Sequence, residues 1–319
     1  MEHDEGRVAI TAGDPSGIGA EIILKAIPAI PRNARRRLVI IGDRAVFAQA
    51  AERLKRSVPR PLAFLDCSHP STFRPGRSSA AAGRASLAYL KRAVALWRAG
   101  RIQALVTAPV TKWAIGRVEP SFIGQTEYLA RAMGRREVVM MFVSDRLRVA
   151  LLTRHVPLAR VAAAIDRPAL RRALRLTADG LTAYFGIRHP RLALCGVNPH
   201  AGEAARCGEE ERAVMLPVLR SLRRQGVVCD GPFAADGFFA GRPERYDAVV
   251  CAYHDQGLIP FKMVARDRGC QLSLGLPVPR TSPDHGSALD IAGQGIANPG
   301  SMIYAIRLAM TLACSPSAR

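Results

Sequence analysis

Residues 253–262 gather an imidazole, a carboxylate, an amide, a glycine and a lysine within ten positions. They follow the apolar run 248–252, whose length and composition predict a buried strand. Ligands of α/β proteins usually bind just past the carboxyl ends of strands, so this run is a candidate binding or catalytic site. Taken alone, the same residues would also suit a solvated loop.

Histidine recurs after three of the predicted strands. His155, His200 and His254 each lie within a few residues of a strand end. Three imidazoles at the carboxyl edge of one sheet could bind a divalent metal and leave a coordination position for substrate. Their spacing is far too long to be a metal motif in itself, so three separately hydrogen-bonded histidines are the alternative interpretation.

The elements that would position these residues alternate between strands and helices, which predicts an α/β fold with a largely parallel sheet. Thr126 is expected to cap a helix that opens near residue 125, and residues 144–146 to form a hairpin. Gly231 and Pro232 predict a turn. Apolar runs predict strands at 8–11, 38–41, 61–65, 104–107, 138–143, 147–152, 192–195 and 248–252, and helical spacing predicts helices at 21–29, 80–99, 168–184 and 301–312.

Composition narrows the class of protein. The chain has 319 residues, of which 49% are hydrophobic, as in globular proteins. No apolar run is long enough to cross a bilayer, and the polar N-terminus lacks the apolar segment of a secretory signal. We therefore expect a cytoplasmic protein with no membrane association. The seven cysteines contain no C-x-x-C pair, which indicates buried thiols rather than disulfides or a cysteine zinc site.

The formal net charge of +20 permits nucleic acid or anionic small molecules as partners. The basic residues are dispersed over separate predicted elements, and aromatic residues do not alternate with them. No stacking platform for bases is visible, so we expect no nucleic-acid partner.

Four motifs, taken together and in this order, make the chain resemble the 4-hydroxythreonine-4-phosphate dehydrogenase family from end to end. That resemblance implies oxidation of the substrate's C3 hydroxyl with NAD or NADP and one divalent metal (Zn, Mg, Co or Mn), on the path to pyridoxal 5′-phosphate. The β-keto acid product then loses CO2 and leaves 3-amino-2-oxopropyl phosphate. The motifs are Gly-Asp-Pro-Ser-Gly-Ile-Gly at 13–19, Asn-Pro-His-Ala-Gly-Glu at 198–203, Tyr-His-Asp-Gln-Gly at 253–257 and Arg-Thr-Ser-Pro-Asp-His-Gly at 280–286.

The resemblance also implies the site residues. The metal ligands are expected to be His155, His200 and His254, in an active site at a homodimer interface. The substrate contacts map onto Gln125, Thr126, Lys262, Gln271 and Arg280. An arginine fork and a lysine suit a phosphorylated acid. The family usually has His in place of Gln125 and Asn in place of Gln271, so the substrate pocket is expected to differ in detail.

A second resemblance concerns residues 285–299, which are similar to the adenosine-binding loop of the isocitrate and isopropylmalate dehydrogenases. It implies a cofactor site at His285, Gly286, Ser287, Asp290 and Asn298. A glycine-rich loop lets the backbone approach adenine and ribose closely, while carboxylate and amide groups hydrogen-bond to them. A plain glycine-rich turn before the last helix is the alternative.

By the same analogy we expect a two-domain isocitrate/isopropylmalate dehydrogenase-like fold with mostly parallel sheets and an interdomain cleft. The first domain would comprise residues 1–120 and 285–319, and the second, with the dimer interface, residues 121–284. Asp236 and Asp255 are the candidates for proton acceptor or ligand orienter, and Lys112 is a further one.

Two rival functions stay open. Within the enzyme class, the substrate could be 4-phosphoerythronate, 4-phosphothreonate or an aromatic cis-dihydrodiol acid. In a different class, the chain could be a basic nucleic-acid-binding protein on a degenerate dehydrogenase scaffold. The intact set of three histidines weighs against the second rival.

Overall fold

The computed structural model describes residues 6–59, 61–69 and 72–314. The chain divides into two compact units, Met1–Arg136 with Leu276–Arg319 (unit 1) and Glu137–Gly275 (unit 2). The N-terminal residues on which the absence of a secretory signal was judged lie outside the described part, apart from Gly6. The domain bounds expected from the sequence stay a prediction.

Unit 1 is built on five parallel strands in the order β3-β2-β1-β4-β11. Because all of them run the same way, their carboxyl ends lie at one edge, where the loops that follow β1, β2, β3 and β4 gather. The strands are β1 (Val8–Thr11), β2 (Leu38–Gly42), β3 (Ala63–Asp66), β4 (Ala104–Thr107) and β11 (Arg280–Ser282).

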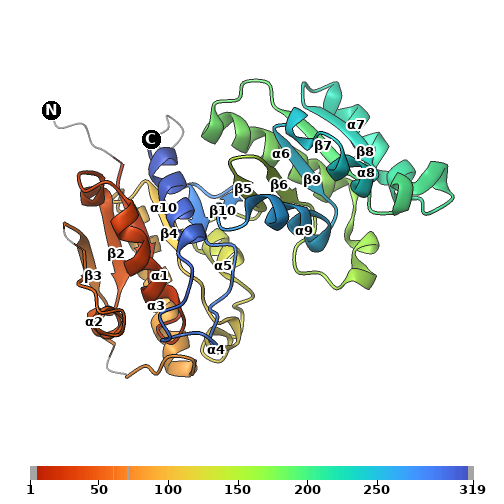
Figure 1. Ribbon diagram of the computed structural model, residues 1–319. Helices are drawn as coiled ribbons and strands as arrows, with labels where there is room; N and C mark the ends of the chain where they lie inside the picture. Colours follow the sequence, from red (N-terminus) through yellow and green to blue (C-terminus); the bar gives the residue numbers. More distant parts are fainter. Residues whose placement is uncertain (1–5, 60, 70–71, 315–319) are drawn as a thin grey trace. The chain divides into compact units, whose positions relative to one another are not determined.

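Helices cover both faces of this sheet (Figure 1). The crossover from β1 to β2 and the crossover from β3 to β4 run in opposite directions, and right-handed crossovers therefore place α1 and α3 on opposite faces. Helices α1, α2 and α10 pack together, and α3 packs with α4 and α5. Their bounds are α1 (Gly19–Ala26), α2 (Arg44–Arg53), α3 (Ala80–Arg98), α4 (Lys112–Gly116), α5 (Gln125–Ala132) and α10 (Gly300–Leu312), with short 3-10 turns η1 (Ile27–Ala29) and η2 (Ala34–Arg37).

Unit 2 has a mixed sheet in the order β10-β5-β6-β9-β7-β8. Strands β10, β5 and β6 pair antiparallel, whereas β6, β9, β7 and β8 pair parallel. The order β6-β9-β7 brings three carboxyl strand ends side by side. The strands are β5 (Val139–Ser144), β6 (Arg148–Leu151), β7 (Arg191–Cys195), β8 (Val228–Phe233), β9 (Ala248–Cys251) and β10 (Gly269–Leu274).

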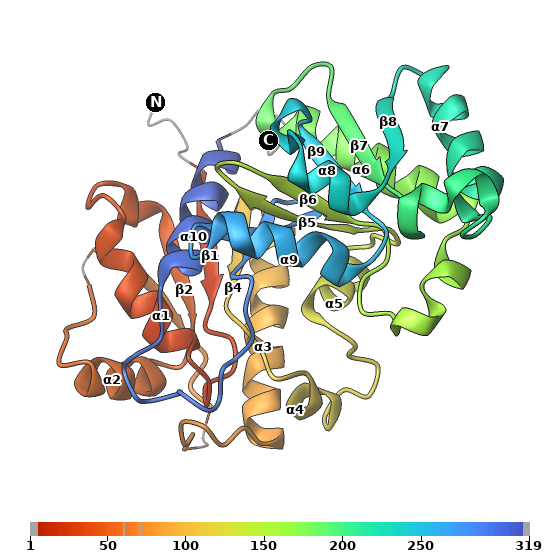
Figure 2. The ribbon, with the colours of Figure 1, turned by 45° about the vertical axis from the view of Figure 1, so that its right-hand side comes forward.

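Figure 2 shows α9 in front of β5 and β6, where it packs against the sheet, while α6 covers the opposite face. Helix α6 has regular ends: Asp166 accepts the N–H of Ala169 at 2.6 Å as its N-cap, and Gly186 closes it in the left-handed conformation. The remaining elements are α6 (Arg167–Phe185), α7 (Leu216–Arg223), α8 (Ala235–Ala240), α9 (His254–Ala265), the π-helical turn η6 (Glu211–Met215) and the 3-10 turns η3 (Leu158–Arg160), η4 (Ala162–Ala164), η5 (Pro199–Ala205) and η7 (Pro243–Arg245).

Two local expectations and one alternative are wrong. The alternative of a solvated loop at 253–262 fails, because α9 begins at His254 and continues through Pro260. The Gly231–Pro232 pair does not form the expected turn, since both residues lie within β8, which continues to Phe233. Gly124, not Thr126, occupies the cap position of α5, and Thr126 is buried within the first turn.

Among the residues that the structure describes, no helix combines the length and the apolar composition of a membrane span.

Candidate functional site

Two of the three candidate metal ligands lie together at the carboxyl edge of the unit 2 sheet. The rings of His155, after β6, and His254, at the start of α9, have centroids 5.9 Å apart. His254 Nδ1 lies 2.7 Å from Asp255 Oδ1, so this carboxylate is placed to orient the imidazole ring and leaves Nε2 on the opposite side of the ring.

His200 follows β7, the next strand along the same edge, within η5. Among the described residues, no three His, Cys, Asp or Glu side chains stand close enough to hold one metal ion together. The donor set nevertheless suits a divalent metal, because three imidazoles leave three adjacent parallel strands and a carboxylate already orients one of them. The rings of His155 and His254 lie close together, whereas His200 does not complete a three-residue cluster with them.

The loop that carries His200 is anchored by Glu211, which the sequence analysis did not single out as a site residue. Glu211 is buried, at 3% exposure. Its Oε1 accepts the N–H groups of Val197 at 2.8 Å and Asn198 at 2.9 Å, and its Oε2 accepts Asn198 Nδ2 at 2.9 Å. The side-chain bond from Asn198 also lowers the pKa of Glu210.

The backbone of this loop has positive φ over six consecutive residues. From His200 to Ala205 every φ lies between 41° and 82°. Only Gly202 among them adopts such angles freely, and a left-handed residue with a side chain costs about 1–2 kcal/mol. The segment that carries His200 is therefore strained, and Glu211 bonds to Val197 and Asn198 directly before it.

The other predicted site residues of unit 2 lie apart from these bonds. Asp236 is exposed in the first turn of α8, and Lys262 is exposed on α9. Gln271 is buried in β10, where its Nε2 donates to Ser273 Oγ at 3.0 Å.

Unit 1 holds Arg280 at the start of β11, buried at 3% exposure. Thr107, at the end of β4, accepts from Arg280 Nε at 3.0 Å and from Nη2 at 2.5 Å. Thr126 accepts from Nη1 at 3.2 Å. Two neutral hydroxyl groups thus fix the plane of the guanidinium fork. Sequence reasoning found Arg280 and Thr126 but not Thr107, which ends an apolar strand and carries no signal of its own.

Gln125 lies one residue before Thr126 in the first turn of α5. Its Nε2 donates to the carbonyl of Ala108 at 3.2 Å. Its buried Oε1 has no hydrogen-bond partner. Because the Ala108 carbonyl requires a donor, the orientation of the Gln125 amide is fixed, and an acceptor stands where the family usually has imidazole.

The predicted cofactor loop runs along α1. Ser287 Oγ lies 3.0 Å from Thr111 Oγ1, and the Ser287 carbonyl accepts the N–H of Ile18. His285 Nδ1 contacts the Gly286 carbonyl, while Asn298 Oδ1 accepts the N–H of Gly300. Asp290 is exposed.

A pocket opens beside this loop in unit 1. It is walled by the first glycine-rich loop, by α1 and α2, and by two glycines of the cofactor loop that both have positive φ. Its lining includes Pro15, Gly17, Arg53, Gly293 and Gly295.

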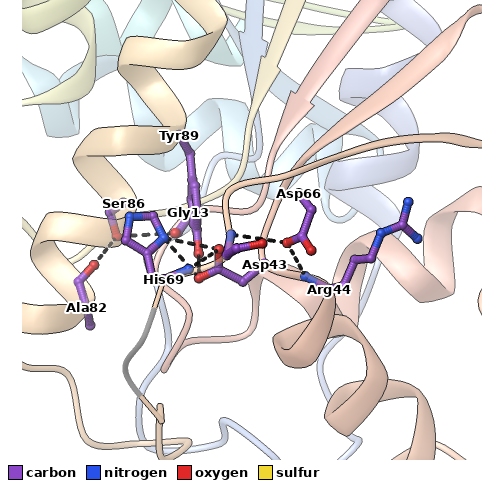
Figure 3. A network of polar contacts seen from close by, with 9 residues as sticks. Gly13, Asp43, Arg44, Asp66, His69, Ala82, Ser86 and Tyr89 are labelled. Atoms are coloured by element: carbon purple, nitrogen blue, oxygen red, sulfur yellow. Dashed lines mark hydrogen bonds and ion pairs between the residues drawn. The ribbon is translucent and has the colours of Figure 1, made fainter.

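A network of polar contacts ties the loops at the carboxyl edge of unit 1 together (Figure 3). The buried Asp43 carboxylate, directly after β2, accepts the Tyr89 hydroxyl at 2.7 Å and lies 3.1 Å from His69 Nδ1. Burial, and then Asp43, raises the pKa of Tyr89 far above its usual range. Burial and Asp43 also raise the pKa of the Cys67 thiol to about 11. These contacts hold the segment after β3 against α3.

This architecture belongs to a known class of dehydrogenase folds. The isocitrate dehydrogenase of Methylococcus capsulatus superposes with a TM-score of 0.51 at 17% identity, covering 98% of this chain and 87% of the other. The chain therefore has an isocitrate/isopropylmalate dehydrogenase-like α/β fold, as expected from its cofactor loop.

The particular family follows from closer relatives. The chain belongs to the family described as pyridoxal phosphate biosynthetic protein PdxA, whose model matches residues 33–309. It is 42% identical to the 4-hydroxythreonine-4-phosphate dehydrogenase of Chromobacterium violaceum over 96% of each chain.

Solved structures agree. The crystal structure of the 4-hydroxythreonine-4-phosphate dehydrogenase of Klebsiella pneumoniae has a TM-score of 0.87 at 33% identity, covering 98% of this chain and 99% of the other. A terephthalate 1,2-cis-dihydrodiol dehydrogenase from Burkholderia xenovorans has a TM-score of 0.64 at 35% identity, with 96% and 98% covered. The family expected from the four motifs is confirmed.

Proposed function

We propose that this protein is a metal-dependent, NAD(P)-linked dehydrogenase that oxidises 4-hydroxythreonine 4-phosphate at C3. The β-keto acid so formed loses CO2 to give 3-amino-2-oxopropyl phosphate. The observation that carries the proposal is the near full-length similarity to 4-hydroxythreonine-4-phosphate dehydrogenases, in a chain that retains all three histidines at adjacent strand ends.

His155, His200 and His254 would hold one divalent metal. Zn, Mg, Co or Mn could serve, and imidazole donors favour the transition metals over Mg. When bound, the metal lowers the pKa of the substrate hydroxyl and polarises the carbonyl oxygen. Asp255 keeps the Nδ1 proton of His254 and so presents Nε2 in the neutral form that a ligand requires.

Asp236 is the proposed acceptor for the hydroxyl proton, because it is exposed and, unlike Asp255, has no histidine to orient. A bound nicotinamide cofactor would supply the acceptor for the hydride that leaves C3. Its adenosine half would occupy the pocket of unit 1 that Gly293 and Gly295 line. The cofactor contacts implied by the resemblance, His285, Gly286, Ser287, Asp290 and Asn298, belong to the same loop. The glycines with positive φ in this loop let the backbone approach a flat ligand closely.

The anionic groups of the substrate are proposed to be bound by Arg280, Thr126 and Gln125 of unit 1. Lys262 and Gln271, the substrate contacts that the family resemblance implies in unit 2, stay a prediction. Arg280 supports this assignment, because Thr107 and Thr126 hold its fork in one plane before any ligand arrives. Gln125 supplies hydrogen-bonding capacity but not the positive charge of an imidazolium.

The protein is proposed to act as a cytoplasmic homodimer. Three of the large apolar side chains described in unit 2 are at least 60% exposed: Leu158 by 71%, Ile259 by 60% and Met263 by 75%. Ile259 and Met263 stand one turn apart on α9 and so form a stripe on the helix that begins with His254. A second copy of the chain would cover such a stripe.

A second substrate class is favoured by one observation. A cis-dihydrodiol dehydrogenase of the same fold is 35% identical over almost the whole chain, and Gln125 is neutral where the resembling family usually has a histidine, which can carry a charge. An unphosphorylated aromatic acid would need less positive charge at this position. The acids 4-phosphoerythronate and 4-phosphothreonate are further candidate substrates, because they carry a phosphate group as 4-hydroxythreonine 4-phosphate does.

The deciding experiment measures formation of NADH or NADPH by the purified protein with a divalent metal. The substrates are 4-hydroxythreonine 4-phosphate, 4-phosphoerythronate, 4-phosphothreonate and a terephthalate cis-dihydrodiol, with His200→Ala as the control. Metal-dependent turnover of the first, absent from the control, supports the proposal. Turnover of the dihydrodiol alone would transfer the protein to the second class, and retention on DNA that falls steeply with salt would favour nucleic-acid binding.

A further inference from the structure

We propose that Glu21 and Lys25 of α1 are positioning residues that lock residues 293–298 of the cofactor loop into its binding conformation. The proposal rests on the proposed cofactor site and extends it to two side chains that lie outside the loop. Both belong to the helix that follows the first glycine-rich loop.

Lys25 and Glu21 form a buried pair with side-chain exposures of 13% and 7%. Lys25 Nζ donates to Glu21 Oε1 at 2.8 Å, to the Gly295 carbonyl at 2.7 Å and to the Ala297 carbonyl at 2.8 Å. The same Glu21 oxygen accepts the N–H of Ala297 at 2.8 Å. All three ammonium protons are thus used, and three bonds tie the loop to a helix some 270 residues away in the sequence.

The residue between the two anchored positions is Ile296, whose side chain is 65% exposed. Its backbone cannot rotate the side chain inward without breaking bonds from Gly295 or Ala297 to Lys25 and Glu21. The Lys25–Glu21 pair therefore keeps the apolar side chain of Ile296 exposed to water, which is unfavourable. A ligand that covered this side chain would regain the free energy of burying its apolar surface.

The pair also indicates which part of a dinucleotide this segment contacts. A lysine beside a glycine-rich loop would ordinarily suggest a phosphate contact. Here the charge of the ammonium group is neutralised by Glu21, and its other two N–H groups donate hydrogen bonds to two backbone carbonyl groups. The segment offers backbone and an apolar side chain but no net charge, which suits the neutral adenosine half and not the pyrophosphate.

The test compares wild type with Lys25→Met and Glu21→Gln, and with Lys91→Met as the matched control on the exposed face of α3. Met keeps the length of the lysine stem but donates no hydrogen bond. Gln retains one acceptor oxygen for the Ala297 N–H, so its effect should be the smaller. Two readouts are needed: amide hydrogen exchange of residues 293–298 in the cofactor-free protein, and the dissociation constants of NAD and NADP by calorimetric titration.

For Lys25→Met we expect exchange in this segment to accelerate about tenfold or more, and cofactor binding to weaken by about tenfold, since two charge-assisted bonds are lost. The KM for substrate should stay unchanged, as should every readout of the control. Unchanged exchange in Lys25→Met would overturn the clamp itself. Faster exchange with unchanged cofactor affinity would reduce the pair to a structural one and also overturn it. Failure of the wild type to bind either cofactor would refute the proposed cofactor site, and this inference with it.

Discussion

Replacement of Glu211 by glutamine tests whether the buried carboxylate positions His200 for metal binding. Glu211 Oε1 receives two backbone N–H groups, and an amide oxygen can still accept both. The second oxygen accepts a hydrogen bond from Asn198 Nδ2 at 2.9 Å. In glutamine an NH2 group takes the place of this oxygen, so two hydrogen-bond donors would face each other and the bond would be lost. The shape of the side chain is retained, so no cavity confuses the result.

The magnitude follows from the three bonds. A hydrogen bond to a charged group contributes about 1.5–3 kcal/mol and a neutral one about 0.5–1.5 kcal/mol. Two bonds weaken by about 1 kcal/mol each and one bond of about 1.5–3 kcal/mol is lost, so the loop loses about 3.5–5 kcal/mol of anchoring before neighbours adjust. Adjustment of the neighbours recovers part of this loss, and removal of a group that orients a ligand typically lowers metal affinity by about 10- to 100-fold, which is the fall expected here.

The assay is a calorimetric titration of metal-free protein with Zn²⁺ or Mn²⁺, alongside thermal unfolding. Glu209→Gln is the matched control, because that side chain is 57% exposed and pairs only with Arg212 among the described residues. The control should bind metal like wild type, within about twofold. Unchanged metal affinity in Glu211→Gln, together with a lowered unfolding temperature, would refute the reasoning and leave Glu211 a structural residue alone.

Three further predictions concern other parts of the chain. Arg280→Lys should raise the substrate KM by about 10- to 100-fold in steady-state kinetics, since one ammonium cannot reproduce a planar fork held by two hydroxyl groups; an unchanged KM would contradict it. Gly83→Ala should destabilise unit 1 by about 1–3 kcal/mol despite the better helix propensity of alanine, because the new Cβ would lie 2.1 Å from the Ala114 carbonyl oxygen. Gly237→Ala, whose Cβ would meet nothing within 4 Å, should instead raise the free energy of unfolding by up to about 1 kcal/mol. Burial raises the pKa of the Cys67 thiol from 9.0 to about 11, so its contribution to stability is fully present below pH 9 and is lost as the pH rises towards 11. The wild type should therefore lose unfolding temperature relative to Cys67→Ser over that interval, and parallel profiles would show that the folded thiol titrates normally.

Much of the fold could be predicted because the buried strands are short apolar runs. Along the chain, these strands (β1, β2, β4, β7 and β9) alternate with segments whose apolar residues have helical spacing. The parallel arrangement follows from that alternation of strands and helices. Helix α9 was not predicted, because it contains Gly257 and Pro260, residue types that usually interrupt helices. In the structure Gly257 is required by packing, since a Cβ there would lie 2.5 Å from a methyl group of Val149.

The candidate site could be predicted only in part, for a similar reason. The histidines are visible because each follows a strand, whereas Glu211 and Thr107 act through hydrogen bonds that depend on folded geometry. Nothing local in the sequence distinguishes Glu211 from Glu209, which is exposed and paired with Arg212. Likewise the link between Lys25 and Gly295 spans 270 positions. Sequence patterns report periodicity and turn chemistry, and such long-range bonds leave no periodic trace.

The order of strands in unit 1 has a consequence for synthesis of the chain. Strand β4 pairs with β11 on one side, yet Thr107 and Arg280 are 173 residues apart. At about 5–20 residues per second, a ribosome needs roughly 10–35 s to deliver the second strand after the first. During that interval the edge of β4 is open to other nascent chains, while the continuous unit 2 can complete its own sheet. The last part of the chain to emerge thus closes the first part to be made, and a chaperone that shields β4 would be needed most while unit 2 is being translated.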